Sequence, residues 1–260
     1  MKIWIISDIH EDITRLREWI KILEERKCEK LICLWDLVWV SVPYYWYMQS
    51  RDSNSVVNVI KEKCEHIVSW NHDLYCTKTL PTSSPFQFPN NRYDLSYPEK
   101  DKLAWWKIWL NDTNELESLL THDNISFLKK LDQSKLIEVD WINILISHRI
   151  YPDLWGVTKN EFNTTSSLWD RYNYMSDIGA TINLVWHSHK HKRRFSRNWI
   201  ADINFWNKYY FNIKVEWFIL PCTCNWTFAN GVTVLDTKEK YIELVPLWTT
   251  PHKIPDWNYL

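Results

Sequence analysis

Glycine is almost missing from this chain, which has 3 glycines among 260 residues. Ordinary usage of about 7% would give roughly 18. A fold that turns often between strands and helices needs residues that tolerate positive φ angles and close backbone approach, and glycine is the usual one. The shortage therefore has to be explained against the fold that the rest of the sequence predicts.

The chain also lacks net charge and long hydrophobic runs. Its formal net charge is −1 and its pI is near 6.8, so no global field favours a nucleic-acid polymer or an anionic membrane. No apolar run approaches the length of a membrane span. The apolar residues after Met1 meet Asp8 too soon for a signal peptide. We therefore expect a cytoplasmic protein with no membrane partner.

Paired cysteines of the metal-binding or redox type are absent as well. The six cysteines contain no C-x-x-C pair, and free cysteine in an apolar stretch behaves as a small hydrophobe. Cys222 and Cys224 have a spacing that could hold a soft metal. Reduced structural thiols are the interpretation we prefer.

Short apolar runs alternate with amphipathic segments in the first 70 residues. The pattern predicts strands at 2–7, 30–34 and 66–69 and helices at 12–27 and 54–64. This spacing is typical of βαβ units, which form a parallel sheet with right-handed crossovers.

Residues 74–138 interrupt that rhythm. A proline-rich irregular loop is expected at 77–98, followed by helices near 99–110, 114–120 and 124–131. Plain connections are much shorter, so an insertion of this length is expected to be a cap. The remaining pattern predicts a helix at 164–178 and strands at 136–139, 142–147, 181–185, 208–214, 216–220, 232–235 and 241–246. We expect one domain over residues 1–260 with 74–138 inserted.

Polar side chains follow five of the predicted strands. They are Asp8 with His10, Asp36, Asn71 with His72 and Asp73, His148, and His187 with His189. Each alone has an ordinary interpretation as a surface histidine, a polar turn or a helix cap. Ligands bind beyond the carboxyl ends of strands in open α/β sheets, so five such sets together predict one polar site.

Together these motifs resemble the calcineurin-like metallophosphoesterases, whose motifs are D-x-H, G-D, G-N-H-D or G-N-H-E, a lone H, and G-H-x-H. Here they read Asp8-Ile9-His10, Trp35-Asp36, Trp70-Asn71-His72-Asp73, His148 and Trp186-His187-Ser188-His189. The resemblance covers roughly the whole chain and is loosest between Asp73 and His148. It implies an α/β fold of two packed mixed β-sheets flanked by helices, a four-layer α/β/β/α sandwich with an inserted cap segment.

The resemblance also implies a dinuclear metal centre. The ligands implied for one divalent ion are Asp8, His10, Asp36 and His189. Those implied for the other are Asp36, Asn71, His148 and His187, so that the Asp36 carboxylate bridges. Mixed nitrogen and oxygen ligands suit Mn, Fe, Zn or Ni. His72 is implied as the general acid or stabiliser near the leaving-group oxygen, with Asp73 orienting its ring.

The leading hypothesis for function is a hydrolase acting on phosphate esters. A metal pair about 3.5–4 Å apart can activate a bridging hydroxide against a phosphomonoester or phosphodiester. The expected substrate is a small phosphate ester, nucleotide-derived esters included. The alternative is a catalytically silent scaffold on the same fold that binds a protein partner. Silent members are expected to lose ligands, whereas every one is present here.

One departure from the family pattern links back to the missing glycine. Trp35, Trp70 and Trp186 stand where the family motifs have glycine, and the chain has 19 tryptophans in all. We hypothesise that the gene has UGA codons at these positions. The native lineage would decode UGA as glycine, whereas the printed sequence reads it as tryptophan. The rival interpretation is a genuine tryptophan-rich variant with a crowded site.

Overall fold

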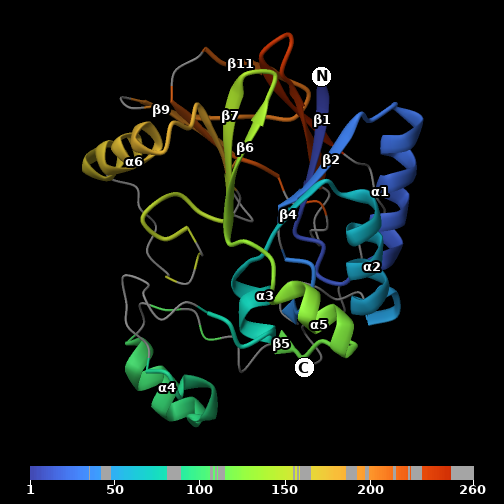
Figure 1. The fold of residues 1–260 in the computed structure, drawn as a ribbon, viewed down its shortest axis with the longest axis vertical. Coiled ribbons are helices and arrows are strands. Elements are labelled where there is room, and N and C mark those ends of the chain that lie inside the picture. The colour runs from blue at the N-terminus through green and yellow to red at the C-terminus, as the bar shows by residue number, and fades with distance from the viewer. Residues whose placement is uncertain are drawn as a thin grey trace, which may run out of the picture.

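The computed structural model describes all residues except 35, 42–47, 81–88, 106–107, 109, 111–114, 155, 157, 159–164, 186–191, 197–198, 213–214, 222, 224–229 and 247–260. Two six-stranded sheets dominate the described chain (Figure 1). Within the described ranges, no helix combines the length and apolar character needed to cross a membrane.

The first sheet carries the N-terminal βαβ units. Its strand order is β11 (Lys208–Tyr210), β14 (Tyr241–Pro246), β13 (Gly231–Asp236), β1 (Lys2–Ser7), β2 (Lys30–Leu34) and β4 (His66–Val68). β1, β2 and β4 are parallel, with Ser7 opposite Leu34 and Leu34 opposite Val68. These three strands therefore end at the same edge of the sheet.

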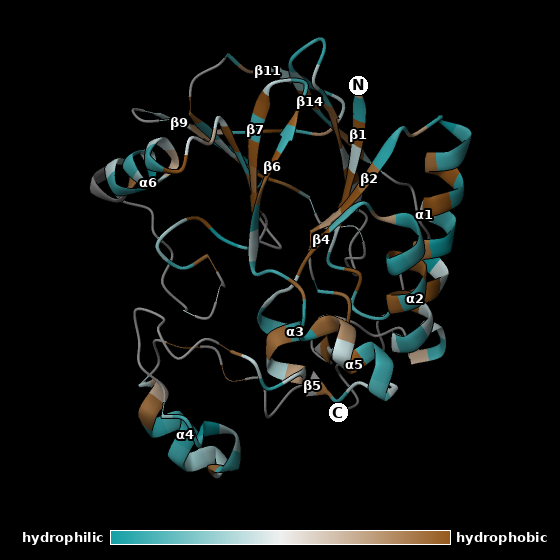
Figure 2. Cartoon of the chain, in the orientation of Figure 1, coloured by the Kyte–Doolittle hydropathy of each residue, from teal (hydrophilic) through white to brown (hydrophobic). Residues whose placement is uncertain are grey.

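Two helices cover the outer face of this sheet. α1 (Ile13–Glu25) and α2 (Ser53–Lys63) each start at an aspartate whose carboxylate accepts a hydrogen bond from a backbone N–H three residues later: Asp12 from Arg15 at 3.1 Å and Asp52 from Ser55 at 2.9 Å. Such caps satisfy N–H groups that the helix itself leaves free. Both helices carry apolar and polar stripes (Figure 2), and their apolar residues pack onto β1, β2 and β13.

The second sheet is built later in the chain. Its order is β10 (Trp199–Asp202), β9 (Arg193–Ser196), β12 (Glu216–Ile219), β8 (Ile182–Val185), β7 (Ile142–Ser147) and β6 (Ser134–Val139). β12, β8 and β7 are parallel and the other pairs are antiparallel. α6 (Thr165–Asp177) covers its outer face through residues such as Leu168 and Met175.

The main core lies between the two sheets. It joins Ile3, Ile32 and Val68 of the first sheet to residues such as Ile144 and Leu184 of the second. Apolar side chains that meet on the inner faces of both sheets hold them together as a sandwich. The predicted arrangement of two mixed sheets flanked by helices is confirmed.

The region after β4 differs in detail from the prediction. α3 (Asn71–Cys76) begins at polar residues for which no helix is predicted, and α4 (Tyr97–Ala104) begins two residues earlier than predicted. The helix predicted at 114–120 is wrong: Glu115–Leu116 form β5, which pairs with β3 (Val40–Ser41). α5 (His122–Leu128) packs against α2, whereas α4 lies away from both sheets (Figure 1). Short 3₁₀ turns occur at Met48–Ser50 and Arg92–Asp94.

Candidate metal centre

The loops that follow β1 and β2 form one rigid edge. The backbone N–H groups of Ile9 and His10 both donate to the carbonyl oxygen of Asp36, at 2.9 and 2.8 Å. Because β1 and β2 are parallel neighbours, these loops emerge side by side. The side chains of Asp8 and Asp36 therefore come from adjacent strand ends, as the sequence predicts.

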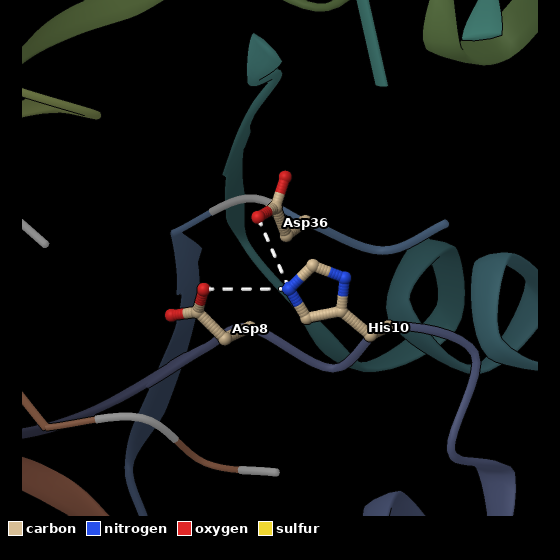
Figure 3. Close-up of side chains that lie close together, drawn as sticks. All are labelled: Asp8, His10 and Asp36. Carbon is tan, nitrogen blue, oxygen red and sulfur yellow. Dashed lines mark ion pairs between the residues drawn. The ribbon is translucent and has the colours of Figure 1, made fainter. Parts of the chain in front are cut away.

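Asp8, His10 and Asp36 form a buried cluster (Figure 3). His10 Nε2 lies 3.2 Å from Asp36 Oδ2 and 3.7 Å from Asp8 Oδ1. One ligand atom from each residue lies within 4.8 Å of the other two. This spacing lets a single divalent ion contact all three side chains.

A backbone carbonyl on the side away from the carboxylates orients the imidazole of His10. Its Nδ1 lies 2.8 Å from the carbonyl oxygen of Trp39, which fixes Nδ1 as the donor and leaves Nε2 facing the carboxylates. A backbone carbonyl in this position is a common partner of metal-ligating histidines. The tautomer presented to the cluster is therefore the one that can bind a metal.

The backbone of this edge is left-handed at several non-glycine residues. The φ angles are 53° at Asp8, 45° at His10, 66° at Glu11 and 45° at Asp36. Such conformations are sparsely populated for L-residues and cluster at functional sites, where the surrounding structure enforces them. This strained backbone directs the side chains of Asp8, His10 and Asp36 toward one point.

The cluster is electrostatically unfavourable without a cation. Burial raises the pKa of Asp8 well above its usual range; His10 opposes the shift and the nearby Asp36 carboxylate adds to it. Neither carboxylate oxygen of Asp8 accepts a hydrogen bond from the described residues. A buried carboxylate with free lone pairs needs a partner charge, so these residues fit a divalent metal ion.

α3 brings the next predicted residues to the same edge. Asn71 is buried, and its Oδ1 accepts no hydrogen bond from the described part of the chain. His72 Nε2 lies 3.9 Å from Asp36 Oδ2, and the His72 and His10 ring centroids are 5.2 Å apart. His72 therefore borders the cluster, and its side chain is more exposed than that of Asp36.

Asp73 holds the β2 loop in place. Its Oδ1 accepts from the N–H groups of Leu37 and Val38 at 3.2 and 3.3 Å, and its Oδ2 accepts from Trp70 N–H at 3.3 Å. Burial and the nearby Asp36 carboxylate raise the pKa of Asp73 to about 7, against the lowering effect of Val38 N–H. The predicted role of Asp73 in orienting His72 stays a prediction.

His148 follows β7 in the second sheet and is fully buried. The Trp70 indole stands against it, with ring centroids 3.2 Å apart at 61°, closer than the 4.5–7 Å usual for aromatic pairs. Gly156 also lies against His148, and a Cβ at Gly156 would overlap His148 Nε2. Little space therefore remains around this imidazole.

A second buried network, which the sequence reasoning missed, lies behind the cluster. Glu11 Oε1 accepts from the backbone N–H of Trp39 at 2.9 Å, and Glu11 also pairs with Arg51 and Ser118. Trp39 is the residue whose carbonyl orients His10. Glu11 directly follows the D-x-H motif, but its partners are distant in sequence, so no local pattern indicates them.

His187, His189, Trp35 and Trp186 lie outside the described residues. Of the predicted metal ligands, the structure brings together Asp8, His10 and Asp36. It places Asn71 at the start of the adjoining helix and His148 at the end of β7.

Solved structures share this fold. A metallophosphoesterase from Sphaerobacter thermophilus is 13% identical with a TM-score of 0.62, over 95% of this chain and 88% of that one. The hypothetical protein PH1004 from Pyrococcus horikoshii OT3 is 11% identical with a TM-score of 0.57, over 96% and 88%. Likeness at such identities shows the fold alone.

Sequence comparison gives the family. No curated protein matches the chain. The model of the calcineurin-like phosphoesterases matches residues 1–193, the stretch that contains all five predicted motifs. The chain belongs to the calcineurin-like phosphoesterase family.

Proposed function

We propose that this protein is a metal-dependent hydrolase of small phosphomonoesters or phosphodiesters. The observation that carries the proposal is the buried Asp8–His10–Asp36 cluster, with its strained backbone and with Asp8 carboxylate oxygens that accept no hydrogen bond from the described residues. Family membership supports the reaction class. The free cysteines among the described residues fit a reducing, cytoplasmic setting.

Two divalent ions (Mn, Fe, Zn or Ni) are proposed as cofactors. The residues proposed to hold them are Asp8, His10, Asp36 and His189 for one, and Asp36, Asn71, His148 and His187 for the other. When bound, such ions supply positive charge to the phosphate and lower the pKa of the attacking water. His10 contributes as a neutral ligand through Nε2, because Nδ1 is held by the Trp39 carbonyl.

His72 is proposed to handle the proton of the leaving group. Its Nε2 faces the Asp36 side of the cluster, and its side chain keeps some exposure to solvent. A histidine there can give a proton to the departing oxygen and regain one from water. Residues 74–138 are proposed as the cap that selects the ester.

The test is hydrolysis of a chromogenic phosphodiester and a panel of nucleotide-derived esters by the full chain loaded with Mn²⁺. We expect turnover that disappears when a chelator removes the metal and returns when Mn²⁺ is added back. The alternative function is a silent scaffold that binds a protein partner, and the crowding of His148 by Trp70 favours it. Metal-loaded protein that cleaves none of these esters would decide for the scaffold.

A further inference from the structure

Tryptophan takes a large share of the left-handed backbone positions in this chain. Twelve non-glycine residues with positive φ are described, and four of them are Trp39, Trp105, Trp141 and Trp206, at 71°, 41°, 65° and 69°. Non-glycine residues at such angles are uncommon, and a bulky side chain there is a genuine outlier. Four large aromatics with this backbone need a common explanation.

Trp141 occupies a turn whose geometry calls for glycine. Val139 of β6 faces Ile142 of β7, so Asp140 and Trp141 form a two-residue hairpin loop. Both loop residues have positive φ, 49° and 65°, which is the type I′ turn. That turn prefers Asn-Gly or Asp-Gly, and here the second place holds tryptophan.

Trp105 and Trp206 stand at comparable positions. Trp105 ends α4 in the left-handed conformation, and its N–H donates to the carbonyl of Asp101; helices commonly end on a glycine with this backbone. Trp206 lies in the turn before β11 and donates its N–H to the Leu244 carbonyl at 2.9 Å. In each case the backbone has the conformation that glycine favours.

Three of the four indoles are largely exposed to solvent. Trp141 is 92% exposed, Trp105 67% and Trp206 60%. Trp39 is buried, but its Nε1 finds no hydrogen-bond acceptor among the described residues, a costly state for a buried donor. Burial therefore offsets little of the backbone strain at Trp105, Trp141 and Trp206, and at Trp39 the unsatisfied Nε1 counts against the benefit of burial.

Trp19 shows what an integrated tryptophan looks like in the same chain. It lies inside α1, is 0% exposed, and donates from Nε1 to the carbonyl of Thr223 at 3.3 Å. Meanwhile, Gly156 and Gly179 have φ angles of 67° and 71°, the same region as the four strained tryptophans. Two kinds of tryptophan position therefore coexist, and one kind matches the glycines.

We infer that the native protein carries glycine at positions 39, 105, 141 and 206, specified by UGA codons that its cell decodes as glycine. Glycine adopts this backbone without a steric penalty. The inference also accounts for 19 tryptophans beside 3 glycines. It extends to position 70, where removal of the indole would free the space beside His148. It does not depend on catalysis.

The first test is the gene itself. We expect UGA at codons 39, 70, 105, 141 and 206, and UGG at codon 19. UGG at codon 105 or 141 would overturn the inference, because the backbone argument is strongest there.

The second test is the mass of the tryptic peptide 136–149 from protein isolated from its native cells. This peptide contains Trp141 as its single tryptophan. A mass lower by the difference between a tryptophan and a glycine residue supports the inference. A peptide with tryptophan at 141 contradicts it.

The third test compares two substitutions in the full-length chain. Trp141→Gly should raise the midpoint of chemical denaturation, because it relieves backbone strain and removes no packing. Trp19→Gly, the matched control, should lower the midpoint, because it empties a buried helical position. A lower midpoint for Trp141→Gly would show that the turn does not require glycine.

Discussion

The two sides of the candidate centre differ in how their side chains meet. On the side of the first sheet, left-handed backbone at Asp8, His10 and Asp36 turns three ligand atoms toward one point. On the side of the second sheet, both the Trp70 indole and Gly156 lie against His148. The contrast shows two ways of shaping a site. Strained backbone positions the ligands of the first sheet, whereas the space around His148 depends on the size of the residues that contact it.

The largest effect is expected from a substitution of Asp36, the ligand that the two sides are proposed to share. Asp36→Asn keeps the shape but removes one charge from the buried cluster. We expect loss of bound metal and a fall in kcat/KM of about 1,000-fold or more, since metal ions contribute several kcal/mol. Metal analysis and ester hydrolysis measure both. Asp140→Asn, in the β6–β7 turn, is the control, and full metal occupancy in Asp36→Asn would refute the ligand role.

His72→Ala separates proton handling from metal binding. We expect kcat to fall about 100-fold while the metal content stays unchanged, because His72 is not needed as a ligand. His66→Ala, at the opposite end of β4, should leave turnover intact. If His72→Ala loses metal in step with activity, the residue belongs to the ligand set instead.

Trp70→Gly tests the second side of the centre, because it enlarges the space beside the His148 imidazole. Removing the indole should improve metal affinity at the His148 side about tenfold, roughly 1.4 kcal/mol of relieved crowding, and raise the metal content at limiting Mn²⁺. Calorimetric titration with Mn²⁺ measures this change. Trp199→Ala, on the edge strand β10, serves as the control. Unchanged affinity in Trp70→Gly would mean that the indole does not limit the second side.

Glu11→Gln probes the support behind His10. Glu11 anchors the Trp39 peptide and pairs with Arg51, so loss of its charge should loosen the carbonyl that orients His10. We expect metal affinity to weaken about tenfold, as for other residues that support metal ligands, with kcat restored at saturating Mn²⁺. Glu65→Gln, in a surface pair with Lys30, is the control. A kcat defect that excess metal does not rescue would assign Glu11 a different role.

Much of the fold could be predicted because its signals are local. The runs 2–7, 30–34 and 142–147 coincide with β1, β2 and β7, since apolar runs of this length are too short for a typical helix and favour a strand. The helix at 71–76 was missed because its first residues, Asn71 to Asp73, are polar and no 3.6-residue period had begun. The wrong helix at 114–120 reflects tertiary override: Glu115–Leu116 pair with β3, far back in the sequence.

The site was predictable to the extent that each motif follows its own strand. Asp8, His10 and Asp36 meet because adjacent parallel strands end at one edge. The network of Glu11, Arg51 and Ser118 could not be predicted. Its three residues are far apart in the sequence, and no local pattern relates them. Nor could the sequence show that Trp70 meets His148, since they follow strands of different sheets, β4 and β7.

The paired hydrogen bonds from Ile9 and His10 to the Asp36 carbonyl also bear on how the protein unfolds. These bonds extend the contact between the two chain segments beyond Ser7 and Leu34, the last pair of the β1–β2 ladder, so separation of the ligands would break them. An ion held by Asp8 and Asp36 would bind the folded chain alone and stabilise it by mass action. Amide hydrogen exchange at Ile9 and His10 would then report metal occupancy as slower opening of the first sheet.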